Sequence, residues 1–242
     1  MLPEDILNQI LASIRNGDCQ AREDLIAEFR PFIARAASKF CGRGLDWNKD
    51  DELSIGLIAF NEAIDRFDEQ RGVPFPAFAR LLIKSRLMDY VRKQSRHTAA
   101  SGGSLDDTEG RDLSSLELSR AWDVYIDQES AREREEEIAE YKKVIGQLGI
   151  TFDDLVRCSP KHRDARATLL RVARVLAGDE LLFAQLMSTG KVPVLALTRK
   201  AEVNIKIIER GRKYIIATSI IWRYCEEFLY LCSFIRLPGK ES

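Results

Sequence analysis

Apolar residues recur every three to four positions through most of the chain, and this periodicity predicts α-helices with no convincing strand. The helical patterns form two groups. The first occupies about residues 2–94, and the second begins near Ser130. Between them, residues 95–110 contain a Ser-Gly-Gly-Ser core and too few apolar side chains to order themselves. The pattern therefore predicts an all-α protein with two helical domains joined by a flexible linker.

The helix predicted over residues 51–68 has apolar residues on both of its faces. One face is an ordinary core stripe that includes Leu53, Phe60 and Ile64. The opposite face mixes isoleucines with polar and acidic residues: Ser54, Ile55, Ile58, Asn61, Glu62 and Asp65. Two interpretations fit this pattern. The helix is either buried on both sides in a larger bundle, or it presents a docking face with apolar anchors and a charged rim.

The helix predicted over residues 79–93 has a similar pattern with the opposite charge. Its core stripe contains Ile83, Leu87, Tyr90 and Val91. From Arg71 to Arg96 there are seven basic side chains and one acidic one. Apolar side chains among cations suit single-stranded nucleic acid, because the cations neutralise phosphates and the apolar side chains receive unstacked bases. A solvated basic face, in which lysine and arginine stems cover apolar surface, is the alternative.

A helix-turn-helix pattern occupies residues 191–222. Pro193 opens the first helix, residues 201–203 lie in or near the turn, and Asn204 starts the second helix. The predicted inward stripe of the second helix is Ile207, Ile208, Gly211, Tyr214 and Ile215. Its opposite face carries Lys206, Glu209, Arg210 and Lys213, which suits a recognition helix in the major groove of DNA.

The charge of the chain is uneven along its length, although the formal net charge is only −1. Residues 105–140 hold thirteen acidic and four basic side chains, whereas residues 191–213 hold seven basic and two acidic ones. This distribution predicts two DNA-contacting domains on an acidic tether.

Other classes of protein are disfavoured by the sequence. The most apolar stretch, residues 214–235, is interrupted by charges and makes a poor membrane span, so we expect no membrane insertion. With two histidines and no CxxC pair, we expect no metal site and no cofactor, and we expect the five cysteines to be reduced thiols in a cytoplasmic protein. We also find no glycine-rich phosphate loop and no nucleophile–base pair, so we do not expect an enzyme.

The segment DELSIGLIAFNEAIDRFD, followed by RGVPFPAFARLLIKSRLMDYVR, resembles region 2 of bacterial sigma factors, the promoter-reading subunits of RNA polymerase. The resemblance implies that the first helix binds core RNA polymerase through Ser54, Ile55, Ile58 and Asn61, with Glu62 and Asp65 on its rim. It also implies that the second segment melts and reads the minus-ten element. The residues at the matching positions are Phe75, Phe78, Leu81, Leu82, Lys84, Ser85, Met88 and Arg92. Leu81 and Leu82 replace the paired tryptophans of primary sigma factors.

The segments FDDLVRCSPKHRDARATLLRVARVLA, KVPVLALTRKAEV and IERGRKYIIA resemble the C-terminal domain of sigma-I type factors. By this resemblance, Asn204, Lys206, Arg210 and Lys213 would recognise the minus-thirty-five element of double-stranded promoter DNA. The resemblance also implies control by a membrane-anchored anti-sigma factor of RsgI type. We accordingly expect a region 2-like domain at 1–97, a flexible acidic linker at 98–129 and a C-terminal helical domain at 130–242.

Three alternatives stay open at this point. Residues 113–130 either form a short helix packed against a domain or lie in a polymerase channel. The apolar tail, residues 224–237, is either a final core helix or an anti-sigma surface. Finally, a stand-alone helix-turn-helix regulator would explain the basic second half of the chain, but not the mixed face of residues 54–65.

Overall fold

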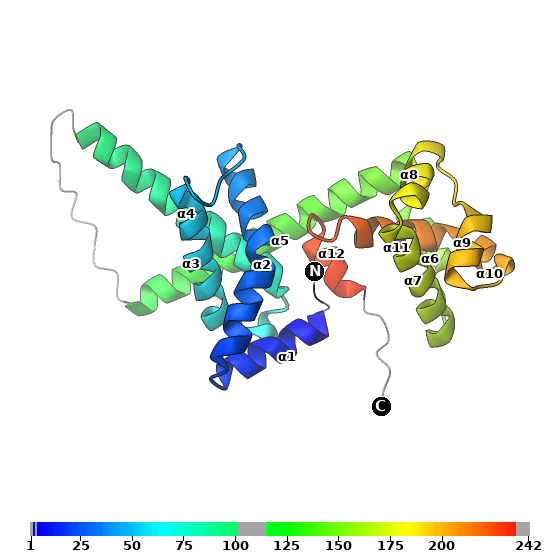
Figure 1. Cartoon of the computed structure of the whole chain (residues 1–242), viewed down its shortest axis with the longest axis horizontal. Coiled ribbons are helices and arrows are strands. Elements are labelled where there is room, and N and C mark those ends of the chain that lie inside the picture. Colours follow the sequence, from blue (N-terminus) through cyan, green and yellow to red (C-terminus); the bar gives the residue numbers. More distant parts are fainter. Residues whose placement is uncertain (1, 3, 101–114, 236–242) are drawn as a thin grey trace. The chain divides into compact units, whose positions relative to one another are not determined.

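The protein is all-α and divides into two compact units, Met1–Glu133 and Arg134–Ser242, in a computed structural model (Figure 1). The structure describes residues 2, 4–100 and 115–235, and the side chains of residues 2, 4–94 and 124–235. These residues form helices and no strand, as the periodicity predicted. None of the described helices is long and apolar enough to cross a lipid bilayer.

Among its described residues, unit 1 contains four helices and the first part of a fifth. They are α1 (Glu4–Arg15), α2 (Cys19–Cys41), α3 (Asp51–Arg66) and α4 (Phe75–Ala100), with a short 3₁₀ helix at Glu69–Arg71 and the start of α5 (Ser115–Gln147). The helices α2, α3 and α4 pack against one another. Gly56 allows α3 to approach α2 closely, since a Cβ atom there would lie 3.0 Å from Cγ2 of Ile33.

The core of unit 1 is built around phenylalanine rings. Phe29 of α2 stacks on Phe60 of α3 with ring centroids 5.2 Å apart. Phe75, at the start of α4, contacts Phe60 and Phe67 edge-on at 5.5 and 5.2 Å. Such edge-to-face pairs add stability beyond the burial of apolar area. The segment that leads into α4 is therefore held to α2 and α3 by aromatic packing.

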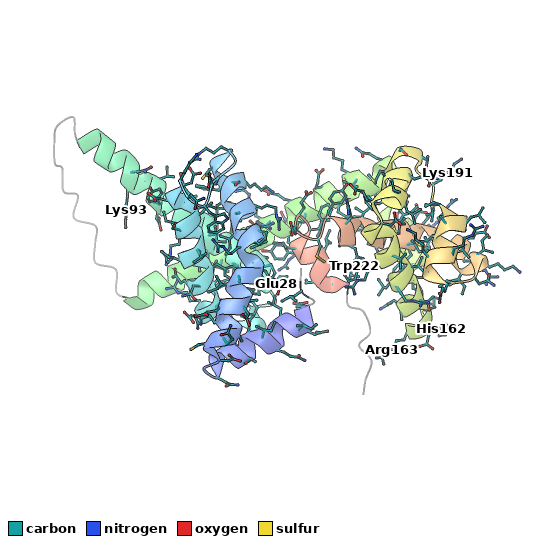
Figure 2. All side chains as sticks on the ribbon, in the orientation of Figure 1. Glu28, Lys93, His162, Arg163, Lys191 and Trp222 are labelled. Carbon is teal, nitrogen blue, oxygen red and sulfur yellow. A yellow bond between two sulfur atoms is a disulfide. The ribbon has the colours of Figure 1, made fainter. Side chains whose placement is uncertain are left out.

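Unit 2 holds the rest of α5 and seven further helices. They are α6 (Phe152–Cys158), α7 (Arg163–Gly178), α8 (Glu180–Thr189), α9 (Val194–Ala201), α10 (Ile205–Arg210), α11 (Arg212–Arg223) and α12 (Leu229–Phe234). The helix α11, which carries Trp222 (labelled in Figure 2), is buried along most of its length and packs on α7. The Arg174 guanidinium of α7 lies 5.2 Å from the Trp222 ring. Tyr141 of α5 donates a buried hydrogen bond to the carbonyl of Ala217, which joins α5 to α11.

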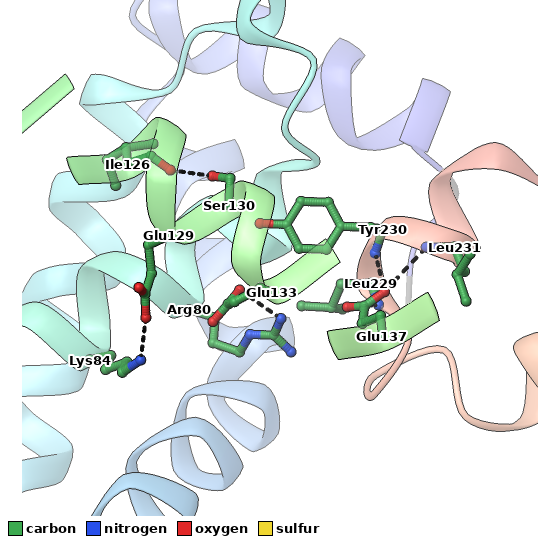
Figure 3. Close-up of polar contacts among 10 residues, drawn as sticks. All are labelled: Arg80, Lys84, Ile126, Glu129, Ser130, Glu133, Glu137, Leu229, Tyr230 and Leu231. Atoms are coloured by element: carbon green, nitrogen blue, oxygen red, sulfur yellow. Dashed lines mark hydrogen bonds and ion pairs between the residues drawn. The ribbon is translucent and has the colours of Figure 1, made fainter. Parts of the chain in front are cut away.

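The apolar tail is mostly a final piece of core. Phe228, Leu229 and Tyr230 are buried, as the core-helix interpretation expected, whereas Phe234 is exposed. The carboxylate of Glu137 in α5 accepts hydrogen bonds from three backbone N–H groups at the start of α12, those of residues 229, 230 and 231, at 2.9, 2.9 and 3.3 Å (Figure 3).

Two of the cysteines differ from the expectation of reduced thiols. Cys225 and Cys232 form a disulfide, and Cys19, Cys41 and Cys158 are free. Their Cα atoms lie 5.5 Å apart, which is the usual separation for a disulfide. The expectation was wrong for this pair because the turn between α11 and α12 brings together two cysteines seven positions apart.

Part of the predicted linker is helical. Residues 101–114, including Leu113, lie outside the described residues. Residues 115–129 belong to α5. Residues 124–130 are helical, with Ile126 and Ser130 buried, as the interpretation of a locally packed helix expects. Entry of this segment into a polymerase channel stays untested. The predicted domain limits at 97 and 130 stay predictions.

Candidate nucleic-acid and partner interfaces

The outer face of α3 is accessible along its length. Ile58 is 66% exposed, Ser54 and Asp65 are exposed, and the other three predicted residues of this face, Ile55, Asn61 and Glu62, are partly buried. The face is therefore not buried in a second core among the described residues. An exposed isoleucine at its centre is the feature that a docking face requires.

Basic residues from the neighbouring helices fix the rim of this face. Arg22 of α2 donates hydrogen bonds to Asn61 at 3.0 Å and to Asp65 at 2.5 Å. Arg86 of α4 forms a bidentate pair with Glu62 at 2.8 and 2.5 Å, and this hydrogen bonding lowers the pKa of the Glu62 carboxyl. The outer face of α3 thus has an exposed apolar residue, Ile58, at its centre and hydrogen-bonded polar and charged residues around it.

The apolar residues predicted to line a DNA surface on α4 are buried instead. Phe75 is 1% exposed, Phe78 is 5% exposed, and Leu81 and Leu82 have no exposed area. The resemblance implied that these four side chains contact the minus-ten DNA, but buried side chains are not accessible for such contacts in this structure. The assignment of the segment to the minus-ten element stays a prediction. The two phenylalanines belong to the aromatic cluster of the core. Leu81, Leu82 and Ile83 are consecutive and fully buried, so α4 is covered around most of its circumference at this point.

The other residues of α4 predicted to contact the minus-ten DNA lie at or near the surface. Ser85 and Met88 are partly buried, whereas Arg92 and Lys93 are exposed, and Lys93 projects from α4 in Figure 2. Lys84 is also partly exposed, but it pairs with Glu129 of α5 at 2.6 Å. This hydrogen bond raises the pKa of Lys84, which is therefore held as a cation.

In unit 2, α9 and α10 form the predicted helix-turn-helix. Glu202 ends α9 in the left-handed conformation, with φ of 52°. Asn204 caps α10, because its side-chain oxygen accepts a hydrogen bond from the backbone N–H of Lys206 at 2.9 Å. Ile208 is the buried residue of α10, and Lys206, Glu209 and Arg210 are exposed together. These three long side chains form the candidate major-groove face.

The second helix of the motif is shorter than predicted. It breaks at Gly211, where α10 ends and α11 begins. A Cβ atom at Gly211 would lie 2.5 Å from Cδ2 and 2.7 Å from Cδ1 of Leu169 in α7, so the glycine permits close packing of the backbone on α7. The inward stripe is correct for Ile208, Gly211 and Ile215, and Tyr214 is partly buried. It is wrong for Ile207, which is 42% exposed.

Lys213 lies in α11, on the far side of this break. Its ammonium donates a hydrogen bond to Asp154 of α6 at 2.7 Å. With the hydrogen bonds from Thr151, this contact lowers the pKa of Asp154 to about 2. We expected Lys213 to project with Arg210. The helix α10 ends and α11 begins at Gly211, so the two side chains belong to different helices.

The sequence interpretation missed the acidic partners of the basic helix α4. Arg80 pairs with Glu133 at 2.8 Å in addition to the pairs of Lys84 and Arg86. The sequence does contain a pattern that indicates this pairing. Glu129 and Glu133 are four residues apart, as are Arg80 and Lys84, so each pair lies on one face of its helix. The described part of the chain contains no cluster of His, Cys, Asp and Glu that could hold a metal ion.

Unit 1 has an exposed mixed face and a basic helix, and unit 2 has a helix-turn-helix. This combination is typical of a DNA-binding protein that also docks on a protein partner. Residues 25–97 match the family model described as Sigma-70 region 2, which covers α3, the 3₁₀ helix and the described side chains of α4.

Relatives extend this similarity to nearly the whole chain. The chain is 39% identical over 234 residues to "RNA polymerase sigma factor SigI" of Bacillus subtilis (strain 168), covering 95% of this chain and 91% of that protein. It is 35% identical over 236 residues to the protein of the same name from Bacillus anthracis, covering 98% and 94%. It is 39% identical over 213 residues to "RNA polymerase sigma factor SigI1" of Acetivibrio thermocellus, covering 88% and 81%. The chain belongs to the SigI family of RNA polymerase sigma factors.

Proposed function

We propose that this protein is an alternative sigma factor that binds core RNA polymerase and directs it to promoters with two sequence elements. The observation that carries the proposal is the similarity to SigI proteins over 95% of the chain, which includes both basic surfaces. The protein would act by binding and by stabilising opened DNA, with no catalysis of its own and no cofactor.

Polymerase binding is assigned to the outer face of α3. Ile58 would be the apolar anchor, with Ile55 beside it and Ser54, Asn61, Glu62 and Asp65 around them. Exposed apolar residues within a polar rim are typical of protein interfaces. Arg22 and Arg86 hold the rim residues in place through the hydrogen bonds given above. The face is therefore largely preorganised, which reduces the entropic cost of binding.

Reading of the minus-ten element is assigned to α4. The burial of Phe75, Phe78, Leu81 and Leu82 supports a role in shaping the surface from below. Direct contacts would come from Lys84, Ser85, Met88 and Arg92, which are at least partly accessible. The cations would bind phosphates of the single strand, and Met88 would offer an apolar contact for a base.

Reading of the minus-thirty-five element is assigned to α10. Lys206 and Arg210 are exposed, and lysine and arginine are the side chains that most often read guanine in the major groove. Asn204 keeps its side-chain NH₂ group for DNA while its oxygen caps the helix. Lys213 would contact a phosphate once it leaves Asp154.

Control of the protein is assigned to a membrane-anchored anti-sigma factor of RsgI type, on the basis of the sequence resemblance. The protein itself would be cytoplasmic, where its polymerase and promoter partners are. Leu181 of α8 and Leu195 of α9 are strongly exposed apolar residues of unit 2, and they supply area for such a partner.

The polymerase assignment is tested by the double substitution Ile55→Glu and Ile58→Glu. We expect the variant to lose co-elution with purified core RNA polymerase, because charges would replace the apolar anchors. The matched control is Ile6→Glu, a charge introduced at an exposed apolar residue of α1 in the same unit. Circular dichroism and thermal melting establish that both variants fold. A folded double variant that still co-elutes with polymerase would refute the assignment.

A further inference from the structure

An acidic segment of α5 occupies the cations of α4 within unit 1. Glu129 accepts a hydrogen bond from Lys84 at 2.6 Å, and Glu133 accepts one from Arg80 at 2.8 Å (Figure 3). The side chains of Arg80, Glu133 and Glu129 are 13–17% exposed, and that of Lys84 is 37% exposed, so the Arg80–Glu133 pair is largely shielded from solvent and the Lys84–Glu129 pair is partly shielded. Shielding from water and salt makes such pairs stronger than ordinary surface ion pairs.

The two pairs match in register. Arg80 and Lys84 are four residues apart and lie on one face of α4, and Glu129 and Glu133 are likewise on one face of α5. Since Arg80 pairs with the later glutamate and Lys84 with the earlier one, the two helices run in opposite directions along this contact. Two ion pairs in register along the same pair of helices indicate a specific contact between α4 and α5 rather than a single chance pair.

Apolar side chains of α5 also take part in this contact. Among residues 124–133, Ile126 is fully buried and Tyr125 is partly buried, while Val124 is 54% exposed. Ser130 is buried, but its hydroxyl donates to the carbonyl of Ile126 in its own helix. The two charge pairs are the polar part of the contact, and they are the part for which a competing anion offers equivalent acceptors.

We propose that the acidic face of α5, Glu129 and Glu133, is an intramolecular competitor of DNA for Arg80 and Lys84 of α4. The inference rests on the proposed function, in which α4 binds the single-stranded minus-ten element. A phosphate group offers the same oxygen acceptors to guanidinium and ammonium groups as a carboxylate does. While α5 is in place, the free protein binds single-stranded DNA weakly. Displacement of residues 124–133 uncovers the DNA-binding cations.

The first test uses the full-length chain and a fluorescein-labelled single strand of twenty thymidines, with binding followed by fluorescence anisotropy. The variant Glu129→Gln/Glu133→Gln removes both competing charges. If the uncovered state is populated to about 10% or less in the wild type, the variant should bind about tenfold more tightly or better. Equal affinity of the folded variant and the wild type overturns the inference.

The control removes the same charge from exposed positions of the same helix. Asp127→Asn/Glu135→Gln changes the net charge identically, and both residues are exposed. This control should bind the oligonucleotide with wild-type affinity. An equal gain in the control would overturn the inference, because general repulsion of DNA by an acidic helix would then explain the effect.

A second measurement uses the unmodified protein, in case the variant loosens the fold. Amide hydrogen exchange of residues 124–133 is compared with and without a saturating amount of the same oligonucleotide. Faster exchange in the complex supports displacement of α5. Unchanged exchange in a saturated complex overturns it.

A combined variant separates this inference from the proposed function. Arg80→Gln/Lys84→Gln is added to Glu129→Gln/Glu133→Gln, and the gain in affinity should disappear. If the gain remains, Arg80 and Lys84 are not the groups that the acidic residues withhold from DNA, so the inference fails together with the assignment of Lys84, while Ser85, Met88 and Arg92 stay assigned to the minus-ten element. If Glu129→Gln/Glu133→Gln gives no gain, but Arg80→Gln/Lys84→Gln alone impairs polymerase-dependent strand opening, the inference fails and the assignment stands.

Discussion

The substitution Gly211→Ala is expected to destabilise unit 2, although alanine is normally the better helix former. The new Cβ atom would lie 2.5 and 2.7 Å from the two Cδ atoms of Leu169 and 3.2 Å from its Cγ. Favourable carbon–carbon contacts are about 3.5–4.0 Å, so these atoms must move. Leu169 is 6% exposed and belongs to the core of unit 2, so its side chain has little room to turn away.

The size of the effect follows from two opposing terms. Overpacking of a core costs about 1–3 kcal/mol. Replacing glycine by alanine in a helix returns at most about 1 kcal/mol, and less at a break between helices. We therefore expect a net loss of about 1 kcal/mol in the free energy of unfolding, which lowers the Tm by about 4 °C for a unit of roughly 100 residues.

The assay is urea unfolding followed by circular dichroism, with Gly178→Ala as the control. Gly178 ends α7 and has no atom within 4 Å of the position that its Cβ would take, so alanine there should be neutral or stabilising. Leu169→Ala should cost less in the Gly211→Ala background than in the wild type, because it makes room for the new methyl group. A Gly211→Ala variant as stable as the wild type would refute the packing argument.

Three further predictions concern unit 2. Hydrogen bonds hold the pKa of Asp154 at about 2 in the folded state against a reference value of 3.8, so its ionised form stabilises the fold above pH 3.8 and this contribution is lost as the pH falls toward 2. Lys213→Gln should therefore destabilise the protein at pH 6 and progressively less at lower pH in urea titrations. Glu137→Gln should lower the free energy of unfolding by about 2 kcal/mol, because a carboxyl oxygen that accepts a backbone hydrogen bond becomes an NH₂ group. Thiol titration of the denatured, unreduced protein should find three free thiols, and reduction of Cys225–Cys232 should cost about 2.5 kcal/mol for so short a loop.

Each of these three predictions has a result that would contradict it. If the loss of stability caused by Lys213→Gln did not change with pH, the lowered pKa of Asp154 would not be due to its hydrogen bond with Lys213. A Glu137→Gln variant with wild-type stability would mean that the contact with α12 contributes nothing. Five titratable thiols would show that the disulfide is not formed.

The sequence predicted the helices and the turn of the helix-turn-helix because these depend on local signals. Asn204 caps α10, and the chain turns at residues 201–203 as expected. The core stripe of α3 was also predicted, since Leu53, Phe60 and Ile64 are buried. Periodicity and capping residues act within a few positions of the chain, so they can be recognised without the tertiary structure.

The sides of α4 could not be predicted in the same way. A helical wheel separates two faces, but it does not show that both are covered at Leu81 and Leu82. The acidic residues that reach α4, Glu129 and Glu133, come about 45–53 residues later in the chain. The break at Gly211 likewise depends on Leu169 of another helix. These features are set by contacts between distant segments, which no local pattern records.

Run-off transcription tests the central claim most directly. Purified core RNA polymerase is supplied with a pool of genomic promoter fragments, with and without the protein, and transcript starts are mapped. A sigma factor should give new discrete starts that depend on the protein and share two spaced sequence motifs. The absence of protein-dependent starts, with binding of the protein to DNA intact, would contradict the sigma-factor assignment and favour a stand-alone DNA-binding regulator.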